Sequence, residues 1–145
     1  MVKKEKKYLH LFLEVVAVTV FLDQLTKYLI SISKPEWKLS FLQIHFVQNT
    51  GAGFGLLKGQ MGILAVISAV VVLAVLFLYK KIPQHKIPQA LFGLFLGGVA
   101  GNLIDRVVRH YVVDFIDVGF WPVFNLADTA ISVSVIGLIL YFWKK

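Results

Sequence analysis

The stretch FNLADTAISVSVIGLILYFW, residues 124–143, decides the fold of this chain. Its length matches the roughly 20 apolar residues that a helix needs to cross the hydrocarbon core of a bilayer. Asp128 stands in the first turn of the expected helix, where lipid should begin. A carboxylate at that depth needs an ion-pair partner, a helix end or a chemical role.

Three further stretches are long and apolar enough to span a membrane, at residues 9–31, 61–79 and 88–107. The chain is 58% hydrophobic and 16% charged, whereas soluble domains are about 45–50% apolar and about 25% charged. We therefore expect an all-α integral membrane protein, a four-helix transmembrane bundle in a single domain, residues 1–145. The first span contains Asp23 and Lys27 and lacks a convincing cleavage site, so it is interpreted as a retained anchor.

The positive charges are concentrated in three places. The net charge is +7, and nine lysines lie in KKEKK (3–7), in KKIPQHK (80–86) and at the last two positions. By the positive-inside rule, both termini and the 80–86 hairpin are cytoplasmic. The outer loops are then residues 32–60 and 108–123. This distribution favours a membrane over nucleic acid as the partner of the charge.

The outer loops carry strand-like patterns. WKLSFLQIHFVQNT (37–50) alternates apolar and polar residues over part of its length, and YVVDFI (111–116) is rich in branched and aromatic residues. Both predict a small extracytoplasmic β-structure, half-buried on the membrane surface. Phe120 and Trp121 follow, as aromatics at a bilayer interface often do.

The polar residues inside the spans fall at one depth. At about 1.5 Å per residue, Asp23 and Lys27 lie roughly 21 to 27 Å along the first helix. Asn102, Asp105 and Arg106 lie equally far along the third. The fourth helix enters the membrane from the outer side, so Asp128 in its first turn lies at the same level. We expect Asp23 with Lys27, and Asp105 with Arg106, to form structural ion pairs that support the bundle.

Other titratable groups receive structural interpretations. Glu14 lies near the inner end of the first span and is expected to extend towards the cytoplasm. The four histidines are scattered without metal-ligand spacing, so no metal site and no cofactor are predicted. The chain has no cysteine, which excludes disulfides and thiol catalysis.

Asp114 and Asp128 form the candidate chemical unit. Asp128 fits a capping box with Asn125 at the N-cap, which is a sufficient structural explanation on its own. Asp114 is flanked by apolar residues in VVDFI, and cap geometry does not explain it. If its strand folds over the bundle, the two carboxylates share a proton. Such a pair can activate water and polarise an amide carbonyl.

Five blocks in order carry a family resemblance. They are DQLTK (23–27), QNTGAGF (48–54), GNLIDR (101–106), VVDFI (112–116) and FNLAD (124–128). On these blocks the chain resembles the bacterial lipoprotein signal peptidases, the type II signal peptidases. The resemblance implies a membrane aspartic endopeptidase that cuts the signal peptide of a prolipoprotein before a diacylglyceryl-modified cysteine, at the outer face of the bacterial cell membrane.

The resemblance also implies the roles of individual residues. The catalytic pair would be Asp114 and Asp128, and the outer β-structure would form a cradle for substrate. Residues near the substrate or supporting the site would be Asn49, Gly51, Asn102, Asp105, Arg106, Asn125, Asp23 and Lys27. Residues 115–123 would form a lid that is short for the family. Membrane lipid would surround the site, and peptide antibiotics of the globomycin type would inhibit it.

Two non-enzymatic alternatives remain at the level of sequence. A small four-span transporter or channel subunit would use Glu14 or Asp23 as a coupling carboxylate. Transporter carboxylates are expected near the midplane, whereas the polar residues here gather at the outer end. A structural assembly subunit would need no aspartate pair.

Overall fold

The computed structural model describes residues 7–52 and 56–143. Four α-helices make up most of the fold: α1 (Leu9–Ser33), α2 (Met61–Phe77), α3 (Lys86–Val108) and α4 (Leu126–Trp143). A 3-10 helix, η2 (Tyr79–Lys81), follows α2. Three strands, β1 (Glu36–Leu39), β2 (Leu42–Asn49) and β3 (Val112–Asp117), complete it. Two basic clusters of the sequence extend beyond the described residues, as does part of the block at 48–54.

Helix α3 is the centre of the bundle. It packs against α1, α2 and α4, whereas α1 and α4 make fewer contacts with each other. Glycines allow the close approach: a Cβ on Gly97 would meet the side chain of Thr19 of α1 at 2.6 Å, and one on Gly98 would meet the backbone of Ala127 of α4 at 2.6 Å. The small residues of α3 therefore bring both neighbours within reach of its polar side chains.

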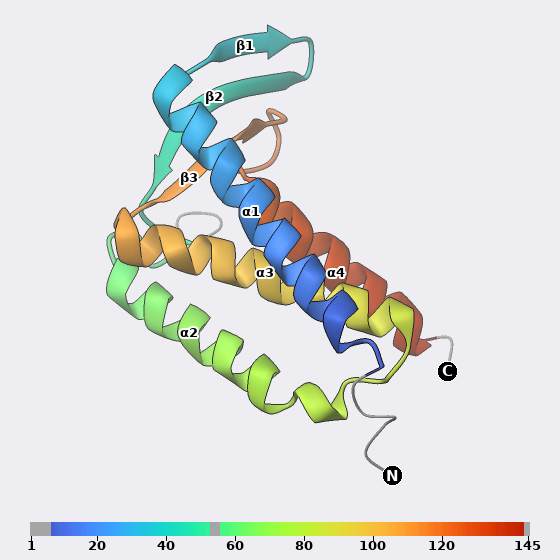
Figure 1. Ribbon diagram of the computed structural model, residues 1–145. Coiled ribbons are helices and arrows are strands. Elements are labelled where there is room, and N and C mark those ends of the chain that lie inside the picture. Colours follow the sequence, from blue (N-terminus) through green and yellow to red (C-terminus); the bar gives the residue numbers. More distant parts are fainter. Residues whose placement is uncertain (1–6, 53–55, 144–145) are drawn as a thin grey trace.

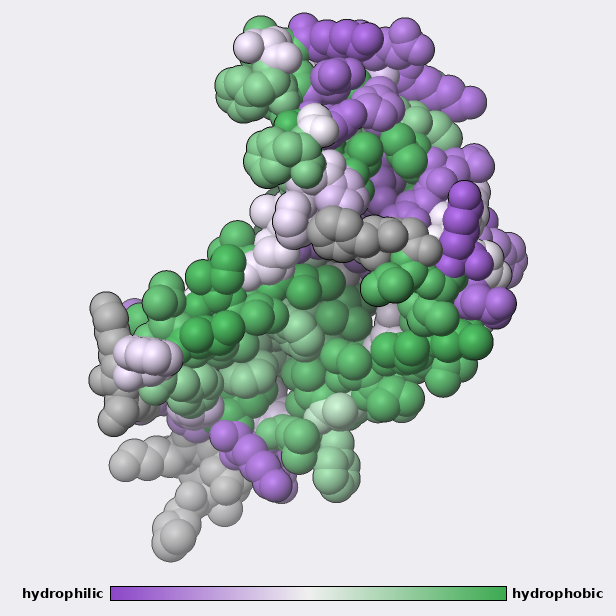
Figure 2. All heavy atoms as spheres, turned by 180° about the vertical axis from the view of Figure 1, so that it is seen from behind, coloured by the Kyte–Doolittle hydropathy of each residue, from purple (hydrophilic) through white to green (hydrophobic). Residues whose placement is uncertain are grey.

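Three helices, α1, α3 and α4, are long and apolar enough to cross a membrane, and the apolar α2 is shorter at 17 residues. Their outer surfaces are rich in exposed hydrophobic side chains. Figure 2 shows these as a hydrophobic belt over the helices, with hydrophilic side chains gathered beyond it at the sheet end. The protein is a mostly helical, multi-pass membrane protein with a small sheet.

The expected β-structure is present. The sheet has the order β1-β2-β3 and is antiparallel throughout, with Val47 of β2 opposite Asp114 of β3. Figure 1 shows the sheet at one end of the bundle, and the start of α1 and the end of α4 together at the other. A strand from each outer loop therefore meets in one sheet above the helix ends.

Helix boundaries differ from the sequence prediction for identifiable reasons. Helix α3 begins at Lys86 rather than at Pro88, because a proline in the first turn forfeits no helical hydrogen bond. Helix α4 begins at Leu126 rather than at Phe124, because Phe124 pairs with Ile116 as an isolated bridge beside β3. Helix α2 ends at Phe77 and tightens into η2, so its predicted end at Tyr79 was two residues too late.

Candidate active site

Asp128 occupies the first turn of α4 and closes a capping box with Asn125. The backbone N–H of Asp128 donates to Oδ1 of Asn125 at 2.9 Å, and the backbone N–H of Asn125 donates to Oδ2 of Asp128 at 3.3 Å. The predicted cap is therefore real. The other carboxylate oxygen, Oδ1, accepts a hydrogen bond of 2.8 Å from Nδ2 of Asn102 of α3. Asp128 thus caps its helix and also faces a polar site.

Asp114 lies on β3 and its side chain is buried. Its Oδ1 accepts from Nδ2 of Asn125 at 2.7 Å, and its Oδ2 accepts from Nδ2 of Asn49 at 2.8 Å. The backbone N–H of Gly51 donates to Oδ1 of Asn49 at 2.9 Å and so sets which side of that amide faces Asp114. Asn125 contacts both aspartates, so it ties β3 to the start of α4.

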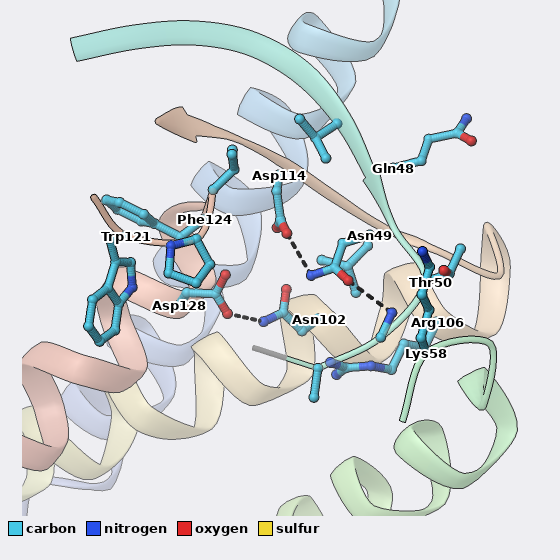
Figure 3. A pocket seen from close by; sticks show the side chains of 16 residues that line it. Gln48, Asn49, Thr50, Lys58, Asn102, Arg106, Asp114, Trp121, Phe124 and Asp128 are labelled. Carbon is cyan, nitrogen blue, oxygen red and sulfur yellow. Dashed lines mark hydrogen bonds between the residues drawn. The ribbon is translucent and has the colours of Figure 1, made fainter. Parts of the chain in front are cut away.

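The two carboxylates point into the same space. Figure 3 shows Asp114 reaching down from the strand and Asp128 reaching across from α4, with Asn49 and Asn102 each bonded to one of them. Burial, and next the charge of Asp128, raise the pKa of Asp114 to about 7, against the weaker opposing effect of the hydrogen bonds from Asn49 and Asn125. Asp114 can therefore hold a proton near neutral pH.

A buried ion cluster lies behind this pair. Nζ of Lys27 is 2.8 Å from Oδ2 of Asp23 and 3.0 Å from Oδ2 of Asp105, and none of the three side chains is exposed. The same Nζ donates to Oδ1 of Asn102 at 2.9 Å. Asp105 also pairs with Arg109. Two cations and two carboxylates therefore balance, as buried charges require.

The cluster holds the two elements that carry Asp114 and Asp128. Oδ1 of Asp23 accepts the backbone N–H of Ala127 in the first turn of α4, at 3.0 Å. Oδ2 of Asp105 accepts the backbone N–H of Val113, next to Asp114, at 3.0 Å. The charged residues of α1 and α3 thus fix the start of α4 and the path of β3.

One predicted pairing was wrong. Asp105 pairs with Lys27 and Arg109 rather than with Arg106, because neighbours in a helix point about 100° apart. Arg106 instead donates to Oγ of Ser68 on α2 at 3.1 Å. The apolar helix α2 therefore makes a polar contact with α3 through its buried Ser68.

A cleft of about 530 Å³ opens over the pair. It is lined by residues of β2, the following loop, α3, β3, the 121–124 segment and α4, including Asn49, Gly51, Lys58, Asn102, Arg106, Asp114, Trp121, Phe124 and Asp128. Among the described residues, no group of three or more His, Asp or Glu side chains could hold a metal ion. Glu14 is exposed and lies on a separate groove beside α1.

Several residues of the site were missed at the level of sequence. Gln24 donates to Asp23, to Asp105 and to the carbonyl of Gly101, and accepts from Arg109. The spacing of four residues between Asp105 and Arg109 was a usable signal for their pair. Ser68 and Lys58 gave none, because their place in the site depends on how α2 packs.

Comparisons with known proteins agree with this fold. The family model described as signal peptidase (SPase) II matches residues 15–144. The chain is 41% identical to the lipoprotein signal peptidase of Halothermothrix orenii, covering 90% of this chain and 94% of that protein. The corresponding protein of Moorella thermoacetica is 39% identical, covering 92% and 91%.

Solved structures resemble the whole chain. One, described as a bacterial membrane enzyme, superimposes with a TM-score of 0.88 at 30% identity and covers 94% of this chain and 90% of its own. A second of the same description gives a TM-score of 0.87 at 30% identity and covers 98% of both chains. The sequence blocks, the sheet over a helical bundle and these matches lead to one conclusion: the chain belongs to the signal peptidase II family.

Proposed function

We propose that this protein removes the signal peptide from prolipoproteins whose cysteine carries a diacylglyceryl group, cutting just before that cysteine. Family membership supports a peptidase that acts on lipoproteins. The observation that carries the aspartic mechanism is the convergence of Asp114 and Asp128 on one cleft, with each carboxylate bonded to an asparagine amide.

The two carboxylates divide the chemistry between them. Ionised Asp128 takes a proton from a water molecule, whose oxygen attacks the scissile carbonyl carbon. Protonated Asp114 donates to the carbonyl oxygen as it gains negative charge. When the tetrahedral intermediate collapses, the C–N bond breaks, the cysteine nitrogen receives the proton that Asp128 took from water, and the proton on the former carbonyl oxygen returns to Asp114. The capping N–H of Asn125 and the positive end of α4 favour ionised Asp128.

The remaining site residues position substrate or hold the pair. Arg106 and Asn49 line the cleft, where they can donate to peptide carbonyls, and Gly51 leaves room for the loop: a Cβ there would meet the Leu56 carbonyl oxygen at 2.9 Å. Asp23, Lys27, Asp105 and Asn125 act through the carboxylates they hold in place. Of the expected lid, residues 115–123, the part up to Asp117 belongs to β3, so the lid would be the segment that follows this strand, with Trp121 at the cleft.

The proposal includes a topology. All four helices span the bacterial cytoplasmic membrane, both termini are cytoplasmic, and the sheet and cleft lie at the outer face. The lipid on the substrate cysteine would then hold the scissile bond at the depth of the two aspartates. Peptide antibiotics of the globomycin type would compete for the same cleft.

The test is cleavage of a diacylglyceryl-cysteine prolipoprotein peptide by detergent-solubilised protein. We expect the natural sequence to cut before the cysteine, and Asp114→Asn and Asp128→Asn each to abolish cutting while the fold survives. Asp117→Asn is the matched control, because Asp117 lies on the same strand but outside the cleft. Cutting by either asparagine variant would overturn the paired mechanism. An inert natural protein, with proton-coupled uptake in liposomes, would favour a transporter instead.

A further inference from the structure

Another hollow lies at the end of the bundle opposite the sheet. It is an apolar groove of about 330 Å³, within the roughly 300–1,000 Å³ of small-molecule sites. Helix α2 gives it one face, because Val71, Ala74, Val75 and Leu78 recur at helical spacing. The other lining residues come from the α2–α3 connection, α3 and the last turns of α4: Lys81, Ile82, Pro83, Phe92 and Phe142.

The groove follows from the way in which the helices pack. Helix α2 packs against α3, but in the described part of the chain no Cα atom of α2 lies within 8 Å of a Cα atom of α4. Helices α2 and α4 both pack against the central helix α3, and a gap separates them. Within a bilayer this gap must be filled by apolar groups, since its walls offer almost no hydrogen-bonding partner to water.

The mouth of the groove is cationic. Lys81 lines it, Lys80 precedes Lys81 in η2, and Lys86 is the first residue of α3. All three lysines are exposed, and no ion pair within residues 7–52 and 56–143 includes any of them. No acidic residue occurs between positions 79 and 86. An apolar groove whose lysine forms no ion pair with any described residue is complementary to one kind of membrane molecule.

We propose that this groove binds an anionic phospholipid, with an acyl chain between α2 and α4 and its phosphate group against Lys80 and Lys81. Basic pockets between spanning helices recognise such headgroups. A zwitterionic lipid would bring its own ammonium group to the same rim and bind less well. The bound chain would connect α2 to α4, which the protein itself leaves apart. This site is independent of the peptidase function.

Native mass spectrometry of the detergent-solubilised full chain tests the proposal. The probes are phosphatidylglycerol and phosphatidylcholine with identical acyl chains. We expect one retained phosphatidylglycerol and several-fold less phosphatidylcholine. Lys81→Gln should weaken retention of phosphatidylglycerol roughly fivefold, the effect expected for one lysine near an anionic headgroup. Ala74→Trp should block the acyl chain and reduce retention of both lipids.

Two matched controls separate a specific site from the general lipid shell. Lys38→Gln removes an exposed lysine of β1 at the sheet end, and Val70→Trp adds the same bulk to an exposed position of α2 outside the groove. Both should retain phosphatidylglycerol as the natural sequence does. The proposal would be overturned if the natural protein retained the two lipids equally. It would also be overturned if the control variants lost as much phosphatidylglycerol as the groove variants do.

Discussion

Asp114 and Asp128 are chemically identical side chains in different surroundings. Asp128 stands at the positive end of α4 and accepts a backbone N–H of its own cap. Asp114 lies on a buried strand segment and accepts only side-chain amides in the described contacts. Burial and the neighbouring carboxylate together raise the pKa of Asp114 to about 7. In the proposed mechanism, these surroundings favour Asp114 as the member of the pair that carries the proton.

The first prediction concerns the pH dependence of cleavage. If Asp114 must be protonated, the rate constant should fall as the pH rises through about 7, because its pKa is raised to that value. The decline should approach about tenfold per pH unit above it. Single-turnover cleavage of the lipidated peptide between pH 5 and 9 measures this. A rate that continues to rise up to pH 9 would contradict the assignment.

A variant of Asn49 tests the same prediction by the direction in which it shifts the pH profile. The hydrogen bond from Asn49 lowers the pKa of Asp114, so Asn49→Ala should raise that pKa and move the alkaline decline to higher pH. Gln43→Ala, on the same strand but outside the cleft, should leave the profile in place. A slower Asn49→Ala protein with an unmoved profile would assign Asn49 to substrate binding alone.

Some contacts of individual residues could be predicted from the sequence, and others could not. The capping box of Asn125 and Asp128 could be predicted, because it is local and joins residues only three positions apart. The pairing of Asp114 with Asn49 was not, because it joins residues 65 positions apart in sequence through a sheet register. Asp105 was assigned to its sequence neighbour Arg106, whereas burial selected Lys27 from another helix.

At the scale of elements, buried charges orient the pieces of secondary structure. Lys27 neutralises Asp23 and Asp105, and these carboxylates in turn hold α4 and β3 by backbone N–H groups. Removing the ammonium group leaves excess negative charge without its buried partner. The cluster therefore has a larger effect than a surface ion pair, which contributes about 0–1 kcal/mol.

The second prediction is that Lys27→Met destabilises the protein by about 3–5 kcal/mol, the usual result of breaking a buried pair. The melting temperature in detergent should fall and cleavage should be lost. Lys38→Met, which removes an exposed lysine, should change neither. An unchanged melting temperature for Lys27→Met would mean that the cluster does not hold α4 and β3 in place.

The third prediction tests the contact between α3 and α4. A Cβ at Gly98 would meet the Ala127 carbonyl oxygen at 2.6 Å and Cγ1 of Ile131 at 2.8 Å, so Gly98→Ala should push α4 and Asp128 away. Overpacking of this kind costs about 1–3 kcal/mol. Gly62→Ala on α2 has open space around the new methyl group and is the matched control. The melting temperature and the rate of cleavage should both fall in the Gly98 variant, and neither should fall in the Gly62 variant.

The elements themselves were largely predictable. Alternating and branched residues indicated strands where β1, β2 and β3 occur, and each predicted helix has a counterpart. The errors lie at helix ends, where Phe124 joins a bridge instead of α4, and in packing. A uniformly apolar helix such as α2 carries no sequence signal for the one polar contact that its Ser68 makes with Arg106.

At the scale of the whole molecule, the polar site and the sheet share one end of an apolar bundle. Figures 1 and 2 show the sheet beyond the hydrophobic belt, with the start of α1 and the end of α4 at the far end. A substrate that spans the membrane as a helix would pass along the belt and present its cleavage site at the level of the cleft. Position in the bilayer would then select the bond to be cut.

The last prediction is therefore the orientation of the chain. The sequence has no cysteine, so single cysteines can report accessibility without a background signal. Lys38→Cys on β1 should react with a membrane-impermeant maleimide in intact bacterial cells whose outer membrane is absent or opened. His85→Cys, exposed in the connection before α3, should react only after the inner membrane is permeabilised.

The reason lies in the distribution of lysines. Those between α2 and α3 belong on the cytoplasmic side by the positive-inside rule, and that side is the one opposite the sheet. The natural cysteine-free chain is the labelling control, and cleavage activity of each variant shows that the labelled molecules are folded. The reverse labelling pattern would put the cleft in the cytoplasm, out of reach of a lipidated cysteine at the outer surface, and would overturn the proposed topology even if the peptidase chemistry held.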